Sequence, residues 1–222
     1  MVVFDLDNTL YRYDVCHKRA LRAVSDLAVS EYGLSARRFL SQYKYSRAIV
    51  KSRIEGASSH NRLLYFSEWI SQFDSKLHID VAVSFNEVYW SAYLYEMKLS
   101  EGVEDLLRRI RHRGIQISLV TDQMSEIQLR KLRVLGIEKY FDYVVTSEEC
   151  AGEKRSGEPF DLLFSRTRSK QFKCLWFFGD EKQDWPSEVP SHEKVFFASP
   201  FARRVPIGVT KIRNYKDICN LV

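Results

Sequence analysis

The sequence lacks long apolar runs, closely spaced cysteines, internal repeats and low-complexity tracts. No apolar run approaches the ~20 residues that a membrane span needs. Asp5 and Asp7 interrupt the only apolar stretch near Met1, so we expect neither a membrane segment nor a signal peptide. The 4 cysteines form no C-x-x-C pair. This is typical of free thiols in a reducing compartment, and we expect a cytoplasmic protein without a disulfide framework.

A strong charge of one sign is also absent, since 34 Lys and Arg face 29 Asp and Glu over 222 residues, a net charge of +5. The densest basic segment is Arg108–Arg113. Apolar residues recur at helical spacing through the same region, at Val103, Leu106, Leu107 and Ile110. The arginines therefore occupy the outer face of an amphipathic helix. No nucleic-acid recognition motif accompanies them, so we interpret this face as solvated and expect no nucleic-acid partner.

Short apolar runs that alternate with helical patterns predict an α/β fold. Five runs indicate strands, at residues 2–4, 115–120, 143–145, 174–178 and 195–197. Helical patterns cover residues 101–113 and 125–135 and a segment after Pro159, and Gly114 and Gly136 close the first two. The second pattern carries its apolar stripe at Leu129, Leu132 and Leu135. Strands that are apolar throughout indicate a Rossmann-like parallel sheet with helices on both faces.

Residues 14–97 differ, because they hold four helical patterns and no strand pattern. A block of this length is too long for a plain crossover. We therefore predict an all-helical cap subdomain at residues 14–97, inserted into an α/β core made of residues 1–13 and 98–222. Aromatic residues at helical spacing, such as Phe66 and Trp69, are expected to pack between the cap helices rather than to form a ligand cage.

Polar residues follow the predicted strands where an open parallel sheet binds its ligands, at the carboxyl ends. These residues are Asp5, Asp7, Thr121, Asp122, Lys154, Asp180 and Asp184. The carboxylates would repel one another unless a cation neutralised them, and Mg²⁺ prefers such oxygen ligands. A lysine and a threonine hydroxyl suit the oxygens of a phosphate. The set therefore favours Mg²⁺-assisted phosphoryl transfer.

Four segments resemble the motifs of the haloacid dehalogenase-like (HAD) superfamily, in the right order over residues 1–184. Residues 3–10, V-F-D-L-D-N-T-L, resemble the first motif, hhhDxDxT. Residues 119–121 are similar to the second, an apolar strand that ends in Ser or Thr. Lys154 with Phe160 resembles the third, and residues 179–184, G-D-E-K-Q-D, resemble the fourth, G-D-x-x-x-D.

The resemblance implies that Asp5 is the nucleophile and forms an aspartyl-phosphate. It also implies that Asp7 protonates the leaving oxygen and then deprotonates water. Mg²⁺ would be held by the Asp5 carboxylate, the Asp7 backbone carbonyl and Asp180, with Asp184 behind them or binding through water. Dehalogenases of this family lack the second aspartate, so Asp7 favours phosphate chemistry.

Phosphate binding is implied for Thr121, for the backbone N–H of Asp122 and for Lys154. Asp122 stands where the family often has Asn, and the Pro-x-Pro that usually follows the motif-three lysine is absent. Lys154 is favoured by register, and Lys170 and Lys173 remain alternatives.

The function predicted in this way is that of an enzyme, a Mg²⁺-dependent phosphomonoesterase acting on a small phosphorylated metabolite, a sugar or sugar-acid phosphate. A phosphomutase needs the same residues and remains an alternative. The segment after Asp184, with prolines at 186 and 190, departs from the family pattern. A catalytically weak module that binds a phosphorylated ligand is therefore a third possibility. We expect a monomer or a homodimer.

Overall fold

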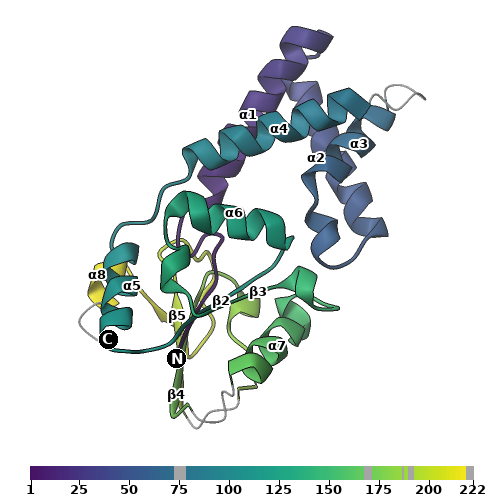
Figure 1. Cartoon of the computed structure of the whole chain (residues 1–222). Helices are drawn as coiled ribbons and strands as arrows, with labels where there is room; N and C mark the ends of the chain where they lie inside the picture. The colour runs from purple at the N-terminus through teal and green to yellow at the C-terminus, as the bar shows by residue number, and fades with distance from the viewer. Residues whose placement is uncertain (73–78, 168–171, 187, 190–192, 219–222) are drawn as a thin grey trace. The chain divides into compact units, whose positions relative to one another are not determined.

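The computed structural model describes residues 1–72, 79–167, 172–186, 188–189 and 193–218. The chain forms two compact units, Met1–Tyr13 with Lys98–Val222 and Asp14–Met97. The first unit holds a parallel sheet with helices, and the second holds helices α1 to α4 (Figure 1). Within the described residues, no helix is both long and apolar enough to cross a membrane.

Among the residues that the structure describes, the sheet of the first unit has six parallel strands in the order β3-β2-β1-β4-β5-β6. Their bounds are Val2–Phe4 (β1), Ile117–Thr121 (β2), Tyr143–Thr146 (β3), Cys174–Gly179 (β4), Glu193–Ala198 (β5) and Thr210–Lys211 (β6). This confirms the predicted α/β class with a Rossmann-like core. The strand β6 was not predicted, because its two residues are exposed and pair only with β5. The second strand begins two residues later than predicted, since the N–H of Ile115 still donates to the carbonyl of Ile110 in the preceding helix end.

Helices and short 3₁₀-helices connect the strands. The helices are Val103–His112 (α5), Ser125–Leu135 (α6), Glu158–Thr167 (α7) and Tyr215–Ile218 (α8). The 3₁₀-helices are Glu138–Tyr140 (η2), Ser147–Glu149 (η3), Lys154–Ser156 (η4) and Lys182–Asp184 (η6). The predicted helix 125–135 is confirmed, and Gly136 ends it in the left-handed conformation with φ 68°. This conformation is open to glycine at little steric cost.

Apolar side chains cover both faces of the sheet. On one face, Phe160 and Leu163 of α7 belong to the same buried cluster as Val3, Val120 and Phe177. On the other, the rings of Phe4 and Phe178 stack with centroids 4.8 Å apart, and Phe197 stacks on Phe178 at 4.7 Å. Figure 1 shows α5 and α7 on opposite sides of the strands. Both faces are thus buried, as the apolar strands predict.

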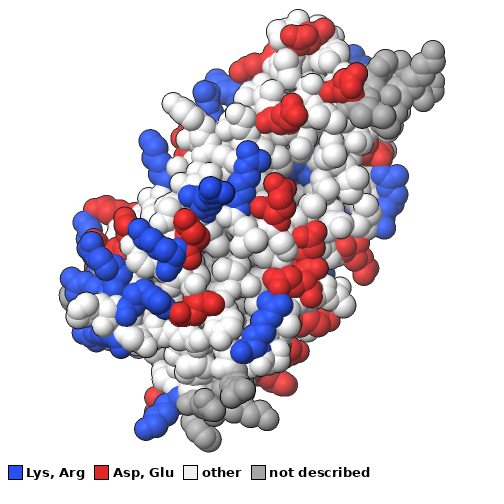
Figure 2. All heavy atoms as spheres, viewed as in Figure 1, with Lys and Arg blue, Asp and Glu red and all other residues white. Residues whose placement is uncertain are grey.

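The basic face of α5 is solvent-exposed, as predicted. Val103, Leu106, Leu107 and Ile110 are buried, whereas the residues of Arg108–Arg113 other than Ile110 are exposed. Blue and red side chains are interspersed around α5 and α8 in Figure 2. Ion pairs such as Arg111 with Asp142 account for part of this mixing. The arginines therefore lie among acidic side chains rather than in an isolated basic stripe.

The second unit is built from four helices around an aromatic interior. They are Tyr13–Tyr32 (α1, whose first residue belongs to the other unit), Ala36–Arg53 (α2), Arg62–Ser71 (α3) and Ile79–Glu96 (α4), with the 3₁₀-helix Ala57–His60 (η1) before α3. The Trp69 ring lies 5.4 Å from that of Phe39 and 5.5 Å from that of Phe85, between centroids. Phe66 lies 5.8 Å from Phe85. The aromatic residues thus pack between the helices, as predicted.

Candidate active site

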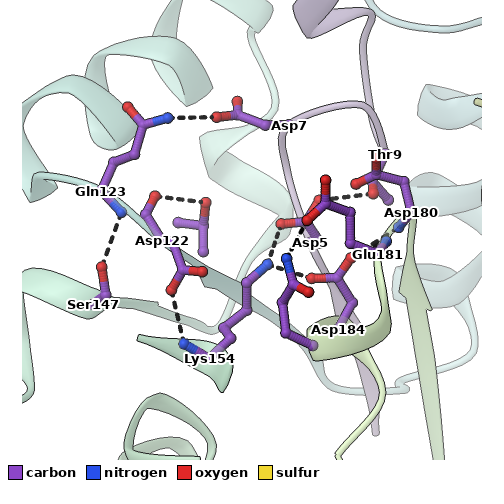
Figure 3. A network of polar contacts seen from close by, with 12 residues as sticks. Asp5, Asp7, Thr9, Asp122, Gln123, Ser147, Lys154, Asp180, Glu181 and Asp184 are labelled. Carbon is purple, nitrogen blue, oxygen red and sulfur yellow. Dashed lines mark hydrogen bonds and ion pairs between the residues drawn. The ribbon is translucent and has the colours of Figure 1, made fainter. Parts of the chain in front are cut away.

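The carboxyl ends of three strands carry polar residues from distant parts of the chain (Figure 3). Asp5 follows β1, Thr121 ends β2, and Asp180 follows β4. Lys154 begins η4 and Asp184 ends η6, so both lie on short helices beside these strand ends. Strand β1 has β2 on one side and β4 on the other, and the chain crosses between these two sides of the sheet. Parallel sheets bind ligands at such a switch point.

Asp5 is only 6% exposed, and both of its carboxylate oxygens are hydrogen-bonded. Its Oδ1 accepts from Nζ of Lys154 at 2.6 Å, and its Oδ2 accepts from the hydroxyl of Thr9 at 2.7 Å. Burial raises the pKa of Asp5 to about 7, against the opposing effect of the Lys154 ammonium and with a further rise from the Asp184 carboxylate. Asp5 is therefore a buried carboxylate whose charge depends on nearby cations.

Lys154 is the lysine that reaches Asp5. Its ammonium donates to Asp5 and to Oδ1 of Asp184. Burial acts to lower the pKa of Lys154, but the Asp184 and Asp5 carboxylates outweigh it and raise the pKa well above the usual value. Of the two alternatives, Lys173 is exposed, and Lys170 lies outside the described residues. The structure thus places Lys154, the lysine favoured by register, against Asp5 and Asp184.

Three carboxylates gather at the ends of β1 and β4 and form a candidate metal site. One oxygen each from Asp5, Asp180 and Asp184 lies within 4.8 Å of the others. Burial raises the pKa of Asp180 to about 9, with the neighbouring carboxylates of Asp5 and Asp184 adding to the rise. Three clustered carboxylates, with the pKa values of Asp5 and Asp180 raised, form a donor set that suits a hard divalent cation such as Mg²⁺.

Asp184 fixes the loop after β4. Its Oδ2 accepts from the backbone N–H groups of Asp180 at 2.8 Å and Glu181 at 2.9 Å. Gly179 permits this close approach, because a Cβ added there would lie 2.1 Å from the Cβ of Asp184. In the G-D-x-x-x-D pattern, the glycine leaves room for the second aspartate, and both aspartates contribute carboxylates to the candidate metal site.

The Asp122 carboxylate points to the backbone of Lys154 rather than to its ammonium. Asp122 Oδ1 accepts from the N–H of Lys154 at 2.9 Å (Figure 3). Burial raises the pKa of Asp122. Beside it, Thr121 is 1% exposed, and its hydroxyl accepts from the side-chain amide of Gln128 at 2.7 Å. Asp122 thus links the carboxyl end of β2 to the start of η4.

Asp7 lies outside the group of three carboxylates and has donors of its own. Nζ of Lys131 lies 2.9 Å from its Oδ1 and 3.0 Å from its Oδ2. The hydroxyl of Tyr11 also donates to Oδ1, and the amide of Gln123 donates to Oδ2 at 3.1 Å. Burial acts to raise the pKa of Asp7, but Lys131 and the Tyr11 hydroxyl outweigh it and lower the pKa. These donors therefore favour the ionised form of the Asp7 carboxylate.

Lys131, Gln123 and Tyr11 were not predicted as site residues. Leu129 was predicted to lie on the apolar stripe of α6, but this leucine is 51% exposed. The buried residues of α6 are Ile127, Gln128, Lys131 and Leu132. Gln128 and Lys131 lie on the buried face of α6. Their spacing along the helix could have indicated a polar site, because long polar residues are buried only when they have partners.

Known proteins match both the sequence and the fold. Residues 2–188 match the family described as haloacid dehalogenase-like hydrolase. A ribulose-1,5-bisphosphate 5-phosphatase of Halopiger xanaduensis is 34% identical over 185 residues, which cover 82% of this chain and 77% of that protein. A phosphorylated carbohydrates phosphatase of Thermotoga maritima is 24% identical over 79% of this chain and 74% of its own length. The Bacillus subtilis protein YfnB, described as a HAD-hydrolase and bound to magnesium in its crystal, superposes with a TM-score of 0.67 at 18% identity, covering 99% of this chain and 96% of that one.

Proposed function

Since this chain belongs to the haloacid dehalogenase-like hydrolases and is a phosphatase of that family, we propose that it is a Mg²⁺-dependent phosphomonoesterase. Its substrate is a small phosphorylated metabolite, a sugar or sugar-acid phosphate, and its reaction passes through an aspartyl-phosphate. The observation that carries the proposal is the buried Asp5 carboxylate, which accepts from the Lys154 ammonium and lies in one cluster with the carboxylates of Asp180 and Asp184.

Asp5 is the nucleophile of the proposed reaction. An oxygen of its carboxylate attacks phosphorus, a P–O bond to Asp5 forms, and the bond to the leaving oxygen breaks. Water then attacks the same phosphorus, and the Asp5–phosphate bond breaks to release inorganic phosphate. Two displacements replace one difficult hydrolysis, which is the general advantage of covalent catalysis. The contacts from Lys154 and Thr9 support this role because they orient both Asp5 oxygens.

Asp7 carries the protons. Although Lys131 and Tyr11 favour its ionised form, Asp7 holds a proton at the start of the first displacement, taken from solvent as the substrate enters or kept from the previous turnover. Its carboxyl gives that proton to the leaving alkoxide oxygen, and in the second displacement the resulting carboxylate takes a proton from the attacking water. A halide leaving group needs no proton, whereas an alkoxide does. A second aspartate two residues after the nucleophile therefore favours phosphate esters over haloacids as substrates.

The carboxylates of Asp5, Asp180 and Asp184 and the backbone carbonyl of Asp7 are the groups proposed to hold Mg²⁺, with Asp184 also orienting the loop that carries Asp180. When bound, the cation supplies charge neutralisation for the phosphoryl group and the nucleophile. The raised pKa values of Asp5 and Asp180 support this assignment, because each records a local excess of negative charge and burial.

Three groups are proposed to bind the phosphoryl oxygens. The hydroxyl of Thr121 accepts from Gln128 and donates to the backbone carbonyl of Asp122 over a long 3.4 Å contact, from which it would turn to a phosphoryl oxygen. The backbone N–H of Asp122 is a second donor, and the Lys154 ammonium is the third. These donors would stabilise the negative charge that spreads over the phosphoryl oxygens in the transition state.

The relatives support the sugar phosphate as substrate class. The Halopiger relative is named for ribulose 1,5-bisphosphate, and the Thermotoga relative for phosphorylated carbohydrates. A phosphomutase would use the same residues but release an isomer, and a weak binding module would release nothing. Release of inorganic phosphate separates the three functions.

The test is a panel of phosphorylated sugars and sugar acids, headed by ribulose 1,5-bisphosphate, assayed for phosphate release with Mg²⁺. We expect turnover by the wild type and its loss in Asp5→Asn, which keeps the size of the side chain. The exposed Glu138→Gln is the control for an acid-to-amide change outside the site. Near-normal turnover by Asp5→Asn would refute the nucleophile assignment.

A further inference from the structure

All the acceptor positions of the Asp7 carboxylate are occupied by side chains of the core. A carboxylate offers about four lone-pair sites. Here Oδ1 accepts from Lys131 and Tyr11, and Oδ2 accepts from Lys131 and Gln123. The proposed acid and base of the reaction is thus fully hydrogen-bonded, so one of these contacts has to open before the leaving oxygen or a water can approach it.

Of the three donors, Lys131 is the charged one, and it is fully buried. Its side chain is 0% exposed, it lies on the buried face of α6, and its ammonium spans both Asp7 oxygens at nearly equal distances. Its Nζ also lies 5.9 Å from the centroids of the Tyr11 and Tyr13 rings. An ammonium is costly to bury without a carboxylate, and Lys131 contacts the carboxylate of Asp7.

We propose that Lys131 is a positioning residue for catalysis, which rests on the proposed function of Asp7 as acid and base. Its ammonium holds the Asp7 carboxylate in one orientation while a weaker neutral contact, that of Gln123 at 3.1 Å, opens to admit the leaving oxygen. Lys131 keeps its own proton throughout. The proton that reaches the leaving oxygen comes from Asp7, and the proton of the attacking water returns to Asp7.

This role predicts a dependence on the leaving group. The value of kcat/KM reports the steps up to transfer of the phosphoryl group to Asp5. An alkoxide leaving from ribulose 1,5-bisphosphate needs the proton of Asp7, whereas the nitrophenolate of p-nitrophenyl phosphate leaves without one. Loss of the Lys131 contact should therefore slow the hydrolysis of ribulose 1,5-bisphosphate much more than that of p-nitrophenyl phosphate.

The experiment compares Lys131→Met with the wild type on these two esters, with Mg²⁺ present. We expect kcat/KM to fall about 10²-fold on ribulose 1,5-bisphosphate, the scale of one acid–base contribution, and by no more than about threefold on p-nitrophenyl phosphate. Lys139→Met, the same substitution at an exposed lysine of η2, is the matched control and should leave both values unchanged. If Lys131→Met does not fold, Lys131→Gln, which keeps a donor without the charge, takes its place.

A second comparison tests whether Lys131 acts through Asp7. In the Asp7→Asn background, Lys131→Met should have no further effect on the sugar ester, because coupled residues are not additive. A further loss in that background, or an equal loss on both esters, would overturn the proposal. So would a wild type that hydrolysed p-nitrophenyl phosphate and no sugar phosphate of the panel. A wild type that hydrolysed neither ester would refute the proposed function itself.

Discussion

The backbone N–H of Lys154 donates to the carboxylate of Asp122 at 2.9 Å, while the ammonium of the same lysine donates to Asp5 at 2.6 Å. One residue is thus fixed at its backbone by the end of β2 and reaches the end of β1 with its side chain. The pairing gives Asp122 a structural task at a position where the family often has Asn.

Substitution of Asp122 should separate this acceptor role from its charge. Asp122→Asn keeps a carbonyl oxygen that can accept from Lys154, so we expect little change in stability. Asp122→Ala leaves a buried N–H unpaired, which should cost about 1–3 kcal/mol of unfolding free energy and lower kcat/KM. Denaturant unfolding and phosphate release measure the two effects. Equal losses in both variants would contradict the acceptor role.

Gly179→Ala should damage the site as well as the fold. The new Cβ would lie 2.1 Å from the Cβ of Asp184, so the loop that carries Asp180 has to move. We expect a loss of about 1–3 kcal/mol in unfolding free energy, the cost of overpacking, together with a loss of turnover. Gly136→Ala is the control, because its strain comes from φ 68° alone and costs about 1 kcal/mol. Unchanged turnover in Gly179→Ala would contradict the tight contact.

Removal of divalent metal should abolish turnover. We expect EDTA to stop phosphate release and added Mg²⁺ to restore it, since three carboxylates meet in the site. Asp180→Asn removes one proposed ligand and should raise the Mg²⁺ concentration needed for half-maximal activity. Titration of activity against Mg²⁺ measures this, and turnover that persists in EDTA would contradict the proposed metal dependence.

The metal-free protein should become less stable as the pH rises. The pKa of Asp5 is raised from 3.8 to about 7 and that of Asp180 from 3.8 to about 9. Above 3.8 the unfolded chain has released these protons while the folded chain retains them, so the unfolding free energy falls with rising pH until the folded values are passed. Thermal melts in EDTA across this window test the slope.

Mg²⁺ should offset this loss, because a ligand of the folded state alone stabilises it. The gain in Tm on adding Mg²⁺ should therefore grow with pH, as the protons that compete for the carboxylates leave. Asp180→Asn should flatten the pH dependence of the metal-free protein. A metal-free Tm that rises between these pKa values would contradict the carboxylate pKa assignments.

The sequence predicts most of the core because its elements obey local rules. The helix Ser125–Leu135 has a serine start and a glycine end, and its bounds were predicted to the residue. The two-residue β6 has no such pattern, since it depends on the edge of β5. The start of β2 was misplaced because the hydrogen bond from Ile115 to Ile110 belongs to the helix end and not to the strand.

Part of the candidate site could also be predicted from the sequence, and part could not. The aspartates at the strand ends could be found from their spacing, because a parallel sheet brings its carboxyl ends together. The contact of Lys131 with Asp7 joins residues 124 positions apart and follows no motif. It was hidden by reading Leu129 as part of the buried stripe, when the helix is rotated so that Gln128 and Lys131 face inward.

The order of the strands in the sheet also affects the order in which the two units fold during translation. Strand β1, which carries Asp5, pairs at Val2 with Ile117 of β2 and with Trp176 of β4. The helical unit at Asp14–Met97 is continuous in sequence and packs mainly through neighbouring helices. Local contacts form faster than distant ones. During synthesis we therefore expect the helical unit to fold before β1 pairs with its second neighbour, so the proposed nucleophile, Asp5, is the first site residue translated and among the last to be enclosed.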